Sequence, residues 1–160
     1  MCWVGKKEDI RIAKEDIEVK KVLMALGNDV TGFFVSPYRN VPYKIDVIYE
    51  ATITPRRSNH PFHQDDGTII IDTGLHCYSA KCDSSTHESV LGGVTVMNIY
   101  LLRTFFLVSF KGTRESHNYV ADIFRNPVLM KCIIPAGTTY YENSNGEIVS
   151  EKLIVKERLT

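Results

Sequence analysis

Apolar and polar residues alternate along several short stretches of the chain, which is the pattern of half-buried β-strands. Residues 17–26, IEVKKVLMAL, begin with this alternation and end in an apolar run that a Gly-Asn-Asp turn closes. Residues 30–53 are rich in β-branched and aromatic side chains and contain Pro37 and Pro42. Because proline cannot donate a hydrogen bond to a strand ladder, we expect two or three short strands there.

Turn-forming residues separate the remaining apolar stretches. Residues 54–67, TPRRSNHPFHQDDG, predict an exposed loop. Residues 68–79, TIIIDTGLHCYS, predict a buried strand, a tight step at Gly74 and a second short strand. Residues 128–155 predict a strand, an Ile-Pro-Ala-Gly-Thr turn, a tyrosine pair and a final hairpin, because an Asn-Gly dipeptide lies between apolar runs.

Two helices are expected between these strands. Ser85 and Glu88 have the spacing of a capping box that opens a helix. Residues 90–110 contain a single charge, Arg103, and are long enough to be considered as a membrane span. We favour a buried helix, or a helix followed by a strand, because a central arginine costs roughly 3 kcal/mol in a bilayer. Residues 116–127 have apolar side chains at helical spacing before a proline.

The sum of these elements is a single domain over residues 1–160 of the α+β class. We expect a mostly antiparallel twisted sheet, with the two helices inserted between the GLHCYS strand and the C-terminal hairpin. The long apolar segment at 90–110 would also suit a subunit interface, so a homo-oligomer is a further expectation.

Charge and targeting signals narrow the function. The chain has 19 basic and 19 acidic residues, which gives no broad positive field for nucleic acid. Its first residues lack the apolar core of a secretory signal, and no membrane partner is expected, so the chain reads as cytoplasmic. In a reducing compartment its cysteines are expected as thiols rather than disulfides. They are Cys2, Cys77, Cys82 and Cys132.

A zinc site is the first chemistry that the sequence raises. His60 and His63 could supply one pair of ligands, and the stretch 76–87 could supply another from two histidines and two cysteines. The spacing is irregular and no Cys-x-x-Cys is present. On a strand, His76 and Cys77 would point to opposite faces, so they could not both reach one metal. We therefore expect no metal site.

Cys2 offers a second chemistry. Removal of the initiator methionine would leave it at the N-terminus, where its thiol would be a nucleophile and its α-amine a base with a pKa near 8. Glutamine amidotransferases and abasic-site crosslinking proteins use such a residue and typically continue with glycine, where this chain has Trp3. This N-terminal nucleophile remains one alternative.

Two stretches carry a resemblance to known proteins. GLHCYS and CIIPAGTTYY with GEIVSEKLIV resemble stretches of short bacterial and phage proteins of uncharacterised function that often begin with Met-Cys, as this chain does. The shared motifs are Gly-Leu-His-x-[Tyr or Phe]-Ser and Ile-Pro-x-Gly-Thr-x-Tyr-Tyr. That resemblance implies an accessory or anti-defence factor of a phage or mobile element, with no activity attached.

More distantly, the same stretches resemble the ADP-ribosyltransferase fold of the arginine, serine, glutamate type. The resemblance implies NAD as the cofactor, Glu151 as the catalytic glutamate and Ser79 as the last serine of a Ser-Thr-Ser strand, with Cys77 replacing the first. The family's first-strand arginine has no counterpart in VKKVLMALG. Lys20, Lys21 or Arg39 would have to take its place, and a lysine offers only a point charge to a phosphate.

Aromatic and polar residues around this region suit a nucleotide-like ligand, because they combine flat stacking surfaces with polar tips. The leading hypothesis is a binding protein that captures a small nucleotide-like ligand or a host protein, and the NAD-using enzyme is its alternative. In the binding hypothesis Ser79 and His76 border the ligand site beside Glu151, and Cys77 packs. The further ligand-binding candidates are Tyr38, Arg39 and Tyr140, with Tyr43 and Tyr141 nearby in sequence.

Overall fold

A computed structural model describes residues 3–25, 34–36, 42–59, 61–63, 66–81 and 126–159 of the chain. The chain divides into two compact units. The first contains Met1–Lys21, Asp46–Cys82 and Lys131–Glu157, and it carries the candidate site. The second contains Val22–Ile45, Asp83–Met130 and Arg158–Thr160.

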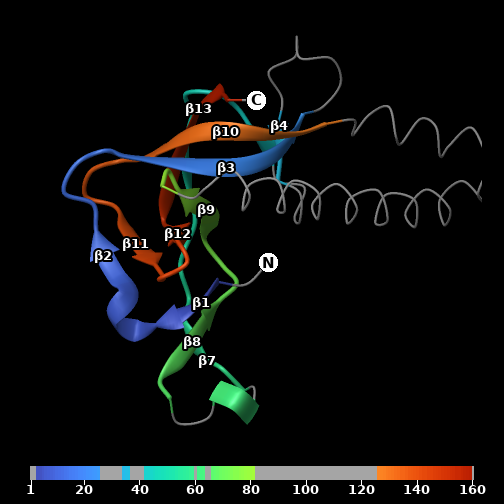
Figure 1. Cartoon of the computed structure of the whole chain (residues 1–160). Coiled ribbons are helices and arrows are strands. Elements are labelled where there is room, and N and C mark those ends of the chain that lie inside the picture. The colour runs from blue at the N-terminus through green and yellow to red at the C-terminus, as the bar shows by residue number, and fades with distance from the viewer. Residues whose placement is uncertain are drawn as a thin grey trace, which may run out of the picture. The chain divides into compact units, whose positions relative to one another are not determined.

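A small antiparallel sheet lies in the first unit (Figure 1). Its central strand is β8 (Thr68–Ile71), which pairs with β1 (Trp3–Lys6) on one side and with β7 (Arg56–Arg57) on the other. The predicted strand after residue 67 is therefore present as β8. The predicted loop at 54–67 is mostly exposed, but it contributes β7 and a 3-10 turn, η3 (Pro61–His63).

The larger sheet has ten strands among the described residues. Its neighbouring strands run in the order β2, β11, β12, β9, β3, β10, β13, β6, and β4 and β5 form a branch from β3. A 3-10 turn, η1 (Lys7–Asp9), connects β1 to β2. The strand bounds are β2 (Ile10–Ile12), β3 (Ile17–Ala25), β4 (Phe34–Val35), β5 (Pro42–Tyr43), β6 (Ile48–Glu50), β9 (Leu75–Ser79), β10 (Asn126–Ile134), β11 (Thr139–Glu142), β12 (Glu147–Ser150) and β13 (Lys152–Arg158).

Buried aromatic and aliphatic side chains of the first unit join the small sheet to β11 and β12. Trp3, Ile71, Tyr141 and Val149 form one core cluster. The Trp3 ring meets Tyr141 edge to face at a centroid distance of 5.6 Å, and its Nε1 donates a hydrogen bond of 2.8 Å to the carbonyl oxygen of Glu147. A buried indole whose only donor is satisfied fixes β1 against β12. β12 is the strand that leads into the candidate site.

The predicted α+β class is wrong. Strands make up 60% of the described residues, and none of the helices among them reaches seven residues. Among the described residues, each strand pair with a defined register is antiparallel, so the described fold is antiparallel β. The helices expected at 85–110 and at 116–127 fall outside the described residues. Other strand predictions are confirmed. The strand predicted at 17–26 is β3, the two strands predicted at 68–79 are β8 and β9, and the predicted Asn-Gly hairpin is β11 with β12.

The described residues include no helix with the length and apolarity that a membrane crossing requires. The apolar segment at 90–110, which raised that question, lies outside them.

Candidate functional site

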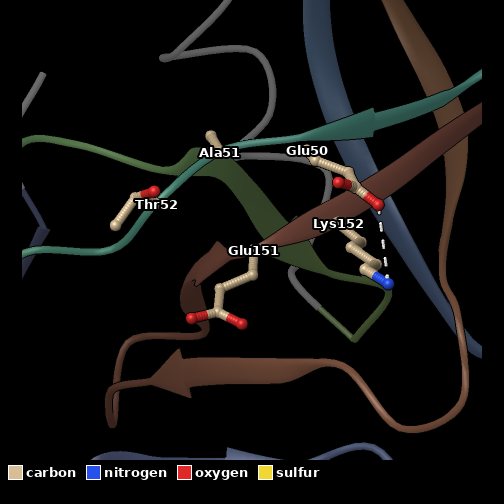
Figure 2. Close-up of a pocket in the computed structure, with 5 residues that line it drawn as sticks. All are labelled: Glu50, Ala51, Thr52, Glu151 and Lys152. Carbon is tan, nitrogen blue, oxygen red and sulfur yellow. Dashed lines mark ion pairs between the residues drawn. The ribbon is translucent and has the colours of Figure 1, made fainter.

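An open pocket lies where β12 turns into β13, next to the end of β6. It has a volume of about 290 Å³ (Figure 2). Its lining residues are Glu50, Ala51, Thr52, Glu151 and Lys152. All five belong to the first unit, so the pocket is formed within one compact part of the chain.

The backbone holds Glu151 in place from both sides. Its N–H donates to the carbonyl oxygen of Thr139 at 3.2 Å, and its own carbonyl oxygen accepts from the N–H of Ala51 at 2.9 Å. Glu151 is the single residue between β12 and β13, and Lys152 pairs with Glu50 across β13 and β6. The pocket therefore forms at a bend whose two arms are both anchored in the sheet.

Gly74 shows why the sequence has glycine beside this bend. Its φ of +84° lies in the left-handed region, which side chains other than glycine rarely adopt. A Cβ at this position would lie 2.7 Å from Cγ2 of Val149 and 3.1 Å from Cγ1 of Ile53. Val149 lies two residues before Glu151 and Ile53 directly follows Thr52, so a side chain at 74 would displace the segments that shape the pocket.

The pocket is acidic. Lys152 Nζ and Glu50 Oε1 form an exposed ion pair at 3.5 Å. Glu151 is half-buried, and within the described residues its carboxylate has neither a hydrogen-bond donor nor an ion-pair partner. Figure 2 shows its side chain directed away from the Glu50 and Lys152 pair. Two carboxylates and one ammonium leave the lining with a formal charge of minus one.

The structure does not bring Ser79 to Glu151. Along the β9 and β12 pair, Leu75 lies opposite Ser150, whereas the Ser79 N–H donates to the carbonyl oxygen of Gly146 at 2.8 Å. Ser79 and Glu151 thus lie five positions apart along this strand pair, or about 17 Å at the usual rise of a strand. The Ser79 hydroxyl accepts a hydrogen bond from the N–H of Lys81 at 3.3 Å, in the turn after β9.

The other predicted ligand residues are also away from the pocket lining. Tyr140 is buried and lies opposite Ser150, one position from Glu151. His76 lies opposite Val149, in the middle of β9. Tyr38 and Arg39 fall outside the described residues. Tyr43 is buried in the second unit, and Tyr141 belongs to the core cluster around Trp3.

A second group of titratable residues is buried in the sheet. The register pairs Val19 with Ser79 and Lys20 with Tyr78, so the next position places Lys21 opposite Cys77. Lys21 is only 8% exposed, and its Nζ donates a hydrogen bond to the carbonyl oxygen of His76. Burial lowers the pKa of Lys21, although the neighbouring Cys77 and Cys132 oppose that shift. We name Lys21, Cys77 and Cys132 the buried row.

The thiols of the buried row are protonated. Burial raises the pKa of Cys77 well above its ordinary value and raises the pKa of Cys132 to about 12. Thiols rather than thiolates are poor nucleophiles. Neither cysteine is in a disulfide. β3 separates β9 from β10, so their Cα atoms are roughly 9.5 Å apart by two strand spacings, which exceeds the reach of a disulfide.

His76 has an unusual environment on the other face of β9. Its Nε2 is buried and has no hydrogen-bond partner within the described part of the chain. Burial, with a smaller effect of the Lys21 charge, lowers its pKa from 6.5 to about 4. The imidazole is therefore neutral at physiological pH.

Metal ligands do not converge in the parts of the chain that the structure describes, where no group of three or more His, Cys, Asp or Glu could hold an ion. His60, Cys82 and His87, from the zinc alternative, lie outside those parts. Cys2, the alternative nucleophile, does as well.

Sequence reasoning missed two features of this unit. The partners of Glu151 in the pocket, Glu50 and Lys152, are ordinary charged residues at strand ends and carry no local signal. Lys21 did carry one. The alternation that begins at Ile17 and Val19 places residue 21 on the inward face, and a charged residue at an inward position marks a buried charge.

Comparison of the chain with protein-family models, with curated proteins and with solved structures finds no match.

Proposed function

We propose that the chain is a small cytoplasmic binding protein that captures a partner protein through the pocket at Glu151, with a lysine or arginine side chain of the partner as the bound group. One observation carries the proposal: the half-buried carboxylate of Glu151 lines the pocket, and it has no ion-pair partner or hydrogen-bond donor among the described residues. A carboxylate held by its backbone binds ammonium or guanidinium through charge-assisted hydrogen bonds.

The charge of the lining decides between the two ligand classes that the sequence raises. A nucleotide carries phosphates, which need free cations or N–H donors. The one cation of the lining, Lys152, is already within 3.5 Å of Glu50, and the lining is negative in sum. A basic side chain of a host protein therefore suits this pocket better than a nucleotide does, in keeping with an accessory or anti-defence factor.

The NAD-using transferase is the second candidate, and one observation favours it. Glu151, its catalytic glutamate by resemblance, faces a pocket rather than the core. The distance to Ser79 and the acidic lining argue against it, because NAD brings a pyrophosphate into the site. The same variant, Glu151→Gln, tests both candidates.

The proposal is tested by nuclear magnetic resonance titration of the amide signals of Ala51, Thr52 and Glu151. The probes are Nα-acetyl-lysine methylamide, Nα-acetyl-arginine methylamide, adenosine monophosphate and NAD. We expect saturable shifts with the two cations only, weakened by salt and lost in Glu151→Gln. Glu147→Gln, at the other end of β12, is the matched control and should keep the shifts.

Two results would contradict the proposal. The first is a set of shifts at these amides with NAD or adenosine monophosphate but with neither cation. The second is turnover of labelled NAD that Glu151→Gln abolishes, which would establish the transferase instead.

A further inference from the structure

The outer edge of β6, next to the pocket, has main-chain N–H and C=O groups that do not bond to β13. β6 is the last strand of the ten-stranded sheet, within the described residues. Ala51 N–H bonds to the Glu151 carbonyl oxygen, and the register runs from Glu50 opposite Lys152 to Ile48 opposite Ile154. In an antiparallel pair the bonded positions alternate. The N–H and C=O groups of Ile48 and Glu50 therefore point away from β13.

The side chains along this edge are apolar and acidic. Ile48 is 56% exposed and lies on the same face as Glu50, two residues on. Exposed strand edges of this kind template the addition of another strand, unless charges, proline or a bulge blocks them. Here the edge ends in the acidic pocket, so charge and hydrogen bonding favour the same site.

We infer that β6 is a docking strand for an extended segment of the partner protein, which carries an apolar residue and a lysine or arginine two positions apart. This inference rests on the proposed function and extends it. The segment would bond to the outward N–H and C=O groups of Ile48 and Glu50. Its apolar residue would pack against Ile48, and its basic residue would lie opposite Glu50, at the edge of the pocket. Main-chain bonds supply affinity in strand addition, and alternate side chains supply specificity.

A second copy of this chain fits the edge less well. A two-fold pairing of β6 with itself must align outward-bonding positions, so it can be centred on Ile48, on Tyr49 or on Glu50. The first register sets Asp46 opposite Glu50, and the last sets Glu50 opposite Glu50. The middle register sets Ile48 opposite Glu50. Like charges directly opposite are destabilising, and none of these registers joins opposite charges.

The experiment uses the full chain and a synthetic peptide of alternating sequence, acetyl-Thr-Ile-Thr-Lys-Thr-Ile-Thr-Lys-amide, with binding measured by calorimetry and by amide shifts along β6. Ile48→Pro removes one outward N–H and leaves the bonds to β13 intact. We expect it to weaken the peptide about tenfold, the loss of about one hydrogen bond. A peptide N-methylated at its central Thr-Lys-Thr should lose binding to the unaltered protein similarly.

The chain offers a matched control at the opposite edge of the same sheet. On β2, Ile12 is 66% exposed, and its outward N–H follows from the bond of Ala13 N–H to the Thr138 carbonyl oxygen. Its neighbour Arg11 pairs with Glu142 at 2.9 Å, so this edge lacks the acidic pocket. Ile12→Pro should leave peptide affinity unchanged. Ile48→Lys adds a charge without altering backbone geometry and should also weaken peptide binding. It replaces Ile48→Pro as the test variant if Ile48→Pro does not fold.

The outcomes separate the edge from the pocket. If the single amino acid probes bind through Glu151 but the peptide binds equally to Ile48→Pro, Ile48→Lys and the unaltered chain, the docking strand is wrong and the pocket stands. If neither the probes nor the peptide bind, the proposed function fails as well. Self-association that Ile48→Pro abolishes, without peptide binding, would assign the edge to a second copy and overturn the inference.

Discussion

The first unit holds charged groups in two opposite environments. In the buried row, Lys21 lies among thiols inside the sheet, and burial lowers its pKa. In the pocket, Glu151 is fixed by two backbone hydrogen bonds, and its carboxylate faces solvent without a partner from the described residues. Burial of the row costs stability, because desolvation disfavours the charged forms of its groups. The pocket keeps a charge where a ligand can reach it, which is why only the pocket suits binding.

The largest expected effect on stability comes from a substitution that leaves a cavity beside the buried row. Ile148 lies opposite Cys77 and is 2% exposed. Ile148→Ala should lower the free energy of unfolding by about 2 to 4 kcal/mol, since the lost methyl groups leave a cavity. Thr52→Ala, in the pocket, should change it by less than about 0.5 kcal/mol. Urea denaturation of both variants provides the measurement, and equal losses would show that the pocket is part of the core.

The pH dependence of stability tests the neutral state of His76. Its pKa is about 4 in the folded protein against an ordinary 6.5, so the unfolded chain binds the proton more readily. The sign follows: stability is fully present above pH 6.5 and falls as pH drops toward 4, by about 3 kcal/mol in total. The loss should be smaller in His76→Gln. Parallel pH curves for the two proteins, obtained by urea denaturation between pH 7 and 4, would show that His76 titrates normally.

Lys21 should act in the same direction at higher pH. Its ordinary pKa is 10.5, and burial lowers the pKa in the folded protein. Between the lowered pKa and 10.5, the unfolded chain therefore binds the proton more readily than the folded protein does. Stability should therefore rise with pH across that interval, by about 1.4 kcal/mol for each unit of pKa lowering. Lys21→Met should remove this rise, measured by urea denaturation at pH 7, 8.5 and 10. Lys20→Met, on the opposite face of β3, is the matched control; a rise that survives in Lys21→Met would assign it elsewhere.

Periodicity predicted the strands well where the alternation was local. Residues 17–26, 68–79 and the Asn-Gly hairpin each carry their own turn signals, and each forms the predicted strand. Strand order is a different matter. β9 lies between β12 and β3, which are far apart in sequence, and pairing at that distance leaves no local pattern. The α+β class was inferred from two apolar segments that were read as helices and lie outside the described residues. The described residues themselves form many short strands.

The candidate site was predictable only in part. Glu151 was singled out by the resemblance to the ADP-ribosyltransferase fold, and it is one of the residues that line the pocket. Ser79 was grouped with it by the same resemblance, but the strand register, which the sequence did not reveal, sets them at opposite ends of the β9 and β12 pair. Glu50 reaches the pocket only through its pairing with Lys152, so no sequence pattern near either residue could have joined them.

The smallest expected effect is the most informative about the pocket. Glu151→Gln keeps the shape of the side chain and the two backbone hydrogen bonds that hold residue 151. Because the carboxylate has no ion pair to lose within the described residues, the free energy of unfolding should change by less than about 0.5 kcal/mol. Lys152→Gln, which breaks the exposed pair with Glu50, should also cost less than about 1 kcal/mol. A loss of about 2 kcal/mol or more in Glu151→Gln, measured by urea denaturation, would mean that the carboxylate holds the β12 to β13 bend together. A small change in the free energy of unfolding would instead mean that the Glu151 carboxylate is available to bind a ligand.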